Sequence, residues 1–295
     1  MVCGCIDIGS NTTRLLVADT RGGALRELLA RRAFTRIGKG LKPGAEIPRA
    51  KILEVADVVA SHRALAGEAG AHPLRTVATA AIRGAANRDE FVEVVSERGG
   101  VEVTILDGEE EARLAFHGAT LTLGRALDGT VGVVDVGGGS TEIAVGTAAE
   151  GVSWWASFRL GSGHLADEYL CSDPPAPAEV AAVRAHARTV LEGLEVPVPG
   201  TAVAVGGSAA SLRRLVGPVL DADTARRALD VLTGAPVAEV ARQFTLDPVR
   251  IRLLPAGVLI LEAAATRLGC PLIIGRGGLR EGVLLELAGI IGGER

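Results

Sequence analysis

The sequence predicts an α/β protein made of two similar halves that face each other across a cleft. Strand-like and helix-like segments alternate along its 295 residues, as is typical of this fold class. CIDIGSNTTRLLVA at 5–18 also aligns without gaps with VVDVGGGSTEIAVG at 133–146. Each copy has the pattern of a strand, a glycine-containing turn and a second strand, with an aspartate just before the turn. A hairpin that recurs in one register indicates a duplicated architecture.

The elements of the first half follow from local residue spacing. Short apolar runs between tight turns predict strands in the hairpin at 5–18 and over 22–34. Apolar residues at helical spacing predict a helix over 49–70. Asp107 and Glu110 have capping-box spacing, which predicts that a helix starts here. The remaining segments are a strand over 74–82, a helix over 88–100, a strand over 101–107 and the continuation of the capped helix to 127.

The second half begins with the other hairpin and repeats the alternation. Its further segments are a strand over 154–160, a helix over 178–194, a strand over 201–207 that enters a helix over 208–216, helical stretches around 224–232 and 236–243, a helix over 253–269, a strand over 271–276 and a helix over 279–289. We therefore divide the chain into a first domain over 1–120 and a second over 121–295. We expect the last helix to pack back on the first domain.

Composition and charge exclude several classes of protein. The net charge of −4 and the aromatic content of 3% give no basic, aromatic-rich surface for nucleic acid. No apolar run reaches the length of a membrane span, and the N-terminus lacks a signal-peptide pattern. The cysteines and histidines lack zinc-site spacing. We expect a cytoplasmic protein with no nucleic-acid or membrane partner, and we leave open whether it is a homodimer.

The turns of the two hairpins predict phosphate binding. Each offers backbone N–H groups and hydroxyls, which together form a nest for phosphate oxygens. Neither is a Walker A loop or a Rossmann turn. A single hairpin of this kind would be an ordinary glycine turn, but two in one register favour phosphate. The predicted phosphate-binding residues are Ser10, Asn11 and Thr12 in the first turn and Gly137, Gly138, Gly139, Ser140 and Thr141 in the second.

Two further features concern a metal and a third turn. Phosphate beside an aspartate is repelled unless a cation lies between them, and Mg²⁺ commonly binds one or two carboxylates together with phosphate. Asp135 and Glu142 flank the second turn and are the candidate metal pair, with solvated strand-end charges as the alternative. Arg14 stands where the second hairpin has Glu142, so we expect the metal at the second hairpin. Gly207 and Ser208 begin a strand-to-helix turn that predicts either a phosphate or nucleoside site or helix packing.

The two hairpins resemble the phosphate-1 and phosphate-2 motifs of the actin, Hsp70 and sugar-kinase superfamily. Over nearly its whole length the chain resembles the exopolyphosphatase and guanosine pentaphosphate phosphohydrolase family. The motifs that carry this resemblance include IDIGSNTTRLLV, VATAAIRGAANRDEF, DGEEEARLAF, VVDVGGGSTEI, SFRLGSGHLADEYL, RLLPAGVLILEAA and GGLREGVLLEL. The resemblance implies two actin-like (ribonuclease H-like) domains that hydrolyse a terminal phosphoanhydride in the cleft between them.

The resemblance also implies roles for particular residues. Glu111 would be the catalytic base that activates water, and Arg83 would bind phosphate. Asp135 would serve both catalysis and the metal, and Glu142 would join it as metal ligand. The spacing of the helix supports the first role, because Glu111 shares a face with apolar residues at i+3 and i+4, whereas Glu110 shares one with Arg113. A carboxylate on a packed face becomes a stronger base. The alternative is that the three glutamates only complement the helix dipole.

The expected activity is therefore Mg²⁺-dependent release of orthophosphate from the end of inorganic polyphosphate. The nearest alternative is the same chemistry on guanosine pentaphosphate in the stringent response. More distant alternatives are an ATP-dependent kinase and a non-catalytic actin-like scaffold. The sequence stops soon after LREGVLLEL, so we expect none of the extra C-terminal helical domains of longer family members, which argues against processive action on long chains.

Overall fold

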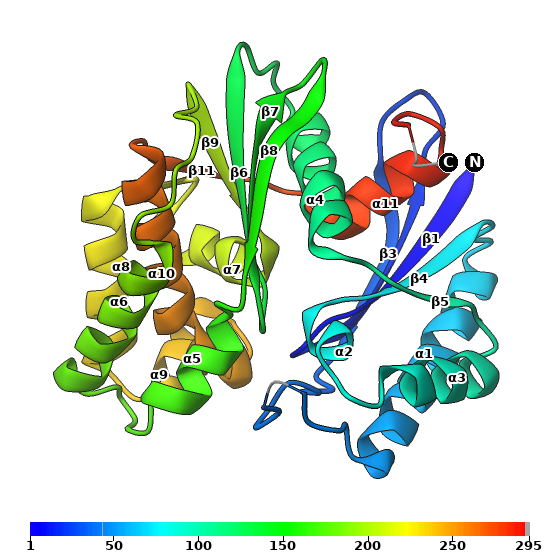
Figure 1. Ribbon diagram of the computed structural model, residues 1–295, viewed down its shortest axis with the longest axis horizontal. Coiled ribbons are helices and arrows are strands. Elements are labelled where there is room, and N and C mark those ends of the chain that lie inside the picture. Colours follow the sequence, from blue (N-terminus) through cyan, green and yellow to red (C-terminus); the bar gives the residue numbers. More distant parts are fainter. Residues whose placement is uncertain (43, 293–295) are drawn as a thin grey trace.

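The computed structural model describes residues 1–42 and 44–292 and contains two β-sheets. The first sheet has five strands in the order β3-β2-β1-β4-β5, and the second has six in the order β10-β11-β9-β6-β7-β8. Helices cover both sheets, which lie on opposite sides of the molecule (Figure 1). We call each sheet with its covering helices a lobe, lobe I for the first and lobe II for the second. The predicted α/β class is confirmed.

The elements have the following bounds. The strands are β1 Val2–Ile8, β2 Thr13–Asp19, β3 Arg26–Ala33, β4 Leu74–Ala78, β5 Val103–Ile105, β6 Thr130–Val136, β7 Thr141–Thr147, β8 Gly151–Phe158, β9 Thr201–Val205, β10 Val219–Leu220 and β11 Leu272–Ile274. The helices are α1 Arg49–Glu68, α2 Ala80–Arg83, α3 Arg88–Gly99, α4 Gly108–Thr122, α5 Ser162–Tyr169, α6 Pro177–Leu191, α7 Gly206–Val216, α8 Ala222–Gly234, α9 Val237–Phe244, α10 Pro248–Leu268 and α11 Leu279–Leu287.

The five strands of the first sheet and five of the second, β8-β7-β6-β9-β11, share one topology, and β10 is an additional strand, so the sequence echo corresponds to a structural duplication. Strand β1 pairs antiparallel with β2 and parallel with β4. Strand β6 pairs in the same way with β7 and β9. The register puts Asp7 opposite Arg14 in the first hairpin and Asp135 opposite Glu142 in the second. Both predicted hairpins are confirmed.

Alternating side chains of the second hairpin point to opposite faces of their sheet. Val134, Val136 and Ile143 pack into the large core that α10 shares. Val133 and Ala144 face the other way and pack against α4. Because side chains alternate along a strand, Asp135 and Glu142 lie on the α4 face. Helix α4 therefore covers the end of the sheet that carries these two carboxylates.

Helices α4 and α11 connect the two lobes. Helix α4 follows β5 of lobe I, yet Ala112, Phe116 and Ala119 pack on the second sheet. Helix α11 follows β11 of lobe II and packs on β1 and α4 instead. The two helices cross between the sheets (Figure 1). The proposed domain division near residue 120 remains a prediction.

Several boundaries differ from the predicted ones, among them those of α10 and β4. Helix α10 begins at Pro248 rather than at 253, because the Asp247 carboxylate caps the Val249 N–H at 2.8 Å. Strand β4 ends at Ala78 rather than at 82, and the short helix α2 follows and ends at Arg83. Across the described residues, none of the helices has the combination of length and apolar character needed to cross a bilayer.

Candidate active site between the hairpin turns

The turns of the two hairpins touch each other between the lobes. Each turn is closed by the same bond: Gly9 donates to the Thr12 carbonyl at 3.0 Å, and Gly137 donates to the Ser140 carbonyl at 2.9 Å. A Cβ added to Gly138 would lie 2.9 Å from the Asn11 Cβ. Glycine is thus required where the second turn meets the first.

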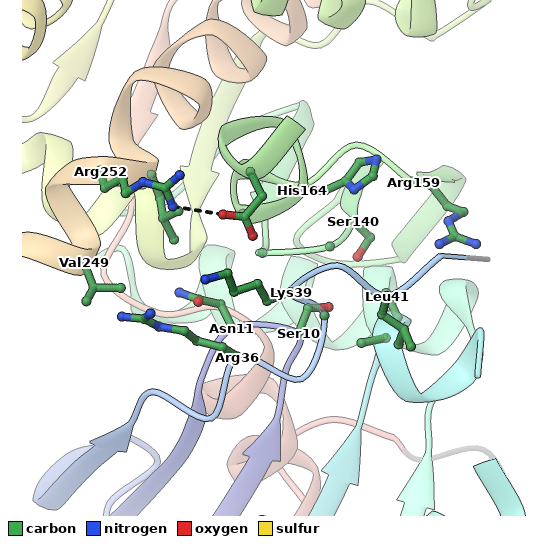
Figure 2. Close-up of a pocket in the computed structure, with 18 of the residues that line it drawn as sticks. Ser10, Asn11, Arg36, Lys39, Leu41, Ser140, Arg159, His164, Val249 and Arg252 are labelled. Carbon is green, nitrogen blue, oxygen red and sulfur yellow. Dashed lines mark hydrogen bonds and ion pairs between the residues drawn. The ribbon is translucent and has the colours of Figure 1, made fainter. Parts of the chain in front are cut away.

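A cavity of about 550 Å³ lies on one side of this contact. Figure 2 shows Ser10, Asn11 and Leu41 on one side of it, and Ser140, His164 and Arg159 on the other. Its cationic lining residues are Arg36, Lys39, Lys42, Arg83, Arg159 and Arg252. Apolar side chains, among them Phe158 and Val249, complete the lining. The cavity can therefore accept a polyanion and also an apolar group attached to one.

A second cavity of about 130 Å³ lies against the same turns. Its lining includes Glu111, Asp135 and the turn residues that also line the larger cavity, namely Ser10, Asn11, Gly138, Gly139 and Ser140. The two hairpin turns are thus accessible from both cavities. A phosphate held by the turns could therefore extend its attached group into either one.

Three carboxylates gather beside the turns, Glu111 and Glu142 buried and Asp135 half-buried. Asp135 and Glu142 are cross-strand neighbours, and Glu142 is only 2% exposed. Glu111, in the first turn of α4, is 7% exposed and lies within electrostatic range of both. Its Oε2 accepts a hydrogen bond from Arg83 Nη1 at 3.0 Å, and the same nitrogen donates to the Leu106 carbonyl at 2.7 Å. The predicted burial of Glu111 is confirmed.

Burial controls the protonation of this cluster. Loss of hydration raises the pKa of Asp135 to about 6, although the Arg14 charge opposes the rise. Loss of hydration and then the Asp135 charge raise the pKa of Glu142 to about 7. Burial and the Glu142 charge raise the pKa of Glu111 well above its ordinary value, whereas Arg83 lowers it. Such a cluster is suited to exchange protons near neutral pH.

Two arginines, the buried Arg250 and the half-buried Arg14, were not predicted as site residues. Arg250 of α10 is 4% exposed, and its Nε has no hydrogen-bond partner among the described residues. A Cβ on Gly207 would lie 2.6 Å from Arg250 Nη1 and 2.7 Å from Arg14 Nη2, so both guanidinium groups crowd this glycine. Burial and the repulsion from Arg14 lower the pKa of Arg250 to about 9. Two cations from opposite lobes therefore lie close together, an arrangement that suits an anion.

The structure brings most of the predicted residues to the cavities, but not all. Ser10, Asn11, Thr12, Arg83, Gly137, Gly138, Gly139, Ser140 and Gly207 line one or both of them. Thr141 is fully buried, and its hydroxyl donates to the Leu160 carbonyl. Ser208 is buried against Gly257 of α10 and is not among the lining residues. These two hydroxyls face the core of lobe II.

The donor set fits a divalent cation that substrate helps to bind. Among the described residues, no three His, Cys, Asp or Glu side chains are grouped closely enough to enclose a metal ion. Asp135 and Glu142 offer two neighbouring carboxylates. Mg²⁺ is commonly bound by one or two carboxylates, with water and substrate phosphate as the other ligands. The pair suits this mode and not a cage made of protein alone.

The paired hairpins, the duplicated sheets and the interlobe cleft together define a two-domain protein of the actin-like fold. The sequence model of the Ppx/GppA phosphatase family matches residues 16–289 of the chain. The chain therefore belongs to the Ppx/GppA phosphatase family, and the resemblance noted in the sequence is confirmed.

Individual relatives agree with this assignment. Exopolyphosphatase 1 of Mycobacterium leprae is 30% identical over 97% of this chain and 89% of that protein. An uncharacterized protein of Streptomyces coelicolor is 34% identical, over 72% of this chain and 64% of that protein. Guanosine-5'-triphosphate,3'-diphosphate pyrophosphatase of Aeromonas hydrophila is 27% identical over 96% of this chain, which spans 59% of that protein. The crystal structure of the Aquifex aeolicus family member superimposes with a TM-score of 0.82 at 28% identity, covering 100% of this chain and 99% of that one.

Proposed function

We propose that this protein is an exopolyphosphatase, which hydrolyses the terminal phosphoanhydride bond of inorganic polyphosphate and releases orthophosphate. One observation carries the proposal: Glu111 is buried beside the Asp135–Glu142 pair, next to the meeting point of two phosphate-type turns. The alignment of Exopolyphosphatase 1 with nearly the whole chain supports the same activity.

In the proposed mechanism Glu111 is the general base. Its raised pKa makes it a better proton acceptor than an exposed carboxylate. Arg83, whose Nη1 lies 3.0 Å from Glu111 Oε2, opposes this rise in pKa and favours the ionised form. A water proton passes to Glu111 as the water oxygen attacks the terminal phosphorus, and the bond to the bridging oxygen breaks. The electron pair of that bond remains on the shortened chain.

The remaining residues hold and polarise the phosphates. Backbone N–H groups of the two turns, with Thr12 and Ser140, would bind the terminal phosphate oxygens. Arg83 would share its donors between Glu111 and phosphate, and Arg14 with Arg250 would bind a further anionic group. Thr141 and Ser208, whose hydroxyls face the core, are left out of this set.

Asp135 and Glu142 would hold Mg²⁺. When bound, the cation neutralises charge that develops on the leaving chain. Glu142 is buried and Asp135 is half-buried, and loss of hydration raises the pKa of both, so a cation there would also offset the cost of keeping them ionised.

Guanosine pentaphosphate is the second candidate substrate. The larger cavity combines cationic with apolar side chains such as Phe158 and Val249, which suits a nucleoside that carries phosphates. The alignment with the Aeromonas hydrophila pyrophosphatase supports the same candidate.

Location and assembly remain predictions. We propose the cytoplasm, because all four cysteines are free thiols, as is usual for a reducing compartment. A homodimer stays open, and light scattering during gel filtration would decide it.

Phosphate release from four substrates tests the proposal. The purified protein is incubated with Mg²⁺ and short polyphosphate, long polyphosphate, guanosine pentaphosphate or ATP. We expect polyphosphate to be hydrolysed and Glu111→Gln to lower kcat by about 10²- to 10⁴-fold, the usual contribution of a general base. Glu109→Gln, an exposed residue of the same helical turn, is the matched control. Full activity of Glu111→Gln would refute the mechanism, and cleavage of guanosine pentaphosphate alone would favour the second candidate.

A further inference from the structure

Ser157 lies beside the carboxylate pair on the edge strand of the second sheet. It is the direct cross-strand neighbour of Glu142, as Glu142 is of Asp135. Asp135, Glu142 and Ser157 thus form one row across β6, β7 and β8. The Ser157 hydroxyl donates a hydrogen bond to Glu142 Oε1 at 2.8 Å.

The same serine contacts the helix that carries Glu111. A Cβ added to Gly108, the first residue of α4, would lie 2.9 Å from the Ser157 Cβ and 3.3 Å from its hydroxyl oxygen. The backbone of Gly108 therefore rests directly on Ser157. Glu111 follows three residues later in the first turn of the same helix. Ser157 thus links the sheet that bears the pair to the start of α4.

We propose that Ser157 is a positioning residue for the reaction. Its hydroxyl holds Glu142 through Oε1 and so sets the orientation in which this carboxylate meets a divalent cation shared with Asp135. Without this partner the carboxylate would lose part of its fixed geometry. The inference rests on the proposed function, because it assigns Ser157 to the cation-binding pair of that site.

A direct phosphate contact is the main competing role, because Ser157 also lines the larger cavity. The geometry favours positioning, since the single hydroxyl proton is already donated to Glu142. The two roles differ in what they control. A positioning residue of the cation pair governs cation affinity and kcat, whereas a phosphate ligand governs the KM for polyphosphate.

Three variants separate these roles. Ser157→Ala removes the hydroxyl, and Ser157→Thr keeps it. Ser153→Ala is the matched control, because Ser153 is an exposed serine of the same strand whose hydroxyl bonds the Val145 carbonyl at 3.2 Å. For each protein, kcat, the KM for polyphosphate and the half-saturating Mg²⁺ concentration are measured. Mn²⁺ is also titrated by calorimetry into protein saturated with orthophosphate, and the unfolding temperature is recorded.

We expect Ser157→Ala to raise the half-saturating Mg²⁺ concentration and to weaken Mn²⁺ binding by about 10-fold, within the range for loss of a partner of a metal ligand. The KM for polyphosphate should change less than about twofold, and Ser157→Thr and Ser153→Ala should behave like wild type. Unchanged Mn²⁺ affinity in Ser157→Ala, a rise confined to the KM, or a Thr variant that matches Ala at an unchanged unfolding temperature would each overturn the proposal. If wild type hydrolysed none of the four substrates, the proposed function would fail, whereas the Mn²⁺ titration would still test Ser157.

Discussion

At the scale of single residues, burial raises the pKa values of the carboxylates in the site more than their mutual repulsion does. Loss of hydration is the largest cause of the raised pKa of Asp135, Glu142 and Glu111. The charge of a neighbouring carboxylate is the second cause for Glu142 and Glu111. A cation bound at the proposed site would offset both causes, because it would pair with the charges that burial disfavours. Substrate and metal would thus favour the ionised carboxylates.

The same raised pKa values predict how stability depends on pH. A carboxyl with a raised native pKa binds more protons in the folded than in the unfolded state, so its stabilising effect is complete below the unfolded pKa. That stability is lost as the pH rises through about 6 for Asp135 and about 7 for Glu142. We expect the ligand-free protein to be less stable to urea at pH 8 than at pH 5, by on the order of 3 kcal/mol.

Glu142→Gln is the matching variant for this measurement. The amide cannot ionise, so the fall in stability between pH 5 and pH 8 should become smaller. Urea unfolding of both proteins at the two pH values gives the comparison directly. A variant with the same pH dependence as wild type would show that Glu142 does not titrate in this range.

At the scale of secondary-structure elements, α4 shows which features the sequence determines locally. Asp107 accepts a hydrogen bond from the Glu110 N–H at 2.8 Å, as its spacing predicted. Glu110 pairs with Arg113, which also pairs with Glu286 of α11, and Glu111 is buried on a different face of α4. Capping and helical periodicity involve residues only three or four positions apart, so both can be read from the sequence.

Contacts between distant segments could not be predicted in this way. Arg14 and Arg250 approach the same glycine although they are 236 positions apart in the numbering, and Arg14 lies in the strand after the first turn rather than in the turn itself. Ser157 meets Glu142 only through strand register. The core-facing hydroxyls of Thr141 and Ser208 were predicted as phosphate ligands because their sequence positions are close to glycine turns. The spacing of residues predicted which turn each hydroxyl lies beside, but not the direction in which each side chain points.

The crossing of α4 and α11 yields a prediction at this scale. A Cβ on Gly118 would collide with the backbone of Gly278 and Gly282, so Gly118→Ala should separate the two helices. Overpacking of this kind costs about 1–3 kcal/mol or more. Gly67→Ala is the control, because Gly67 is an exposed helical glycine with open space around it and should gain about 0.5–1 kcal/mol. Chemical unfolding of the two variants measures both changes, and equal stability would contradict the packing argument.

At the scale of the whole molecule, the site is complete only when both lobes are together. Lobe I contributes Ser10, Asn11 and Arg14, and lobe II contributes the second turn and Arg250. The two turns are in contact, whereas the two arginines repel each other. An anion between the arginines would convert this repulsion into attraction across the cleft. Substrate would then stabilise the association of the lobes that forms its own binding site.

The arginine pair predicts that one substitution maintains or raises the stability of the ligand-free protein but lowers the stabilisation by an anion. Arg250→Gln removes a buried cation that Arg14 repels, so the ligand-free variant should be at least as stable as wild type. Tripolyphosphate at 100 times its Kd should stabilise wild type by about 2.7 kcal/mol, because it binds only the folded state. The variant should lose most of this gain. Arg242→Gln, at an exposed arginine of α9 outside both cavities, should keep it. Urea unfolding with and without tripolyphosphate measures both changes in stability. A variant that is less stable than wild type without ligand, and that keeps the full gain with tripolyphosphate, would contradict the prediction. Arg250 would then stabilise the ligand-free protein, and the anion would have no part in closing the cleft.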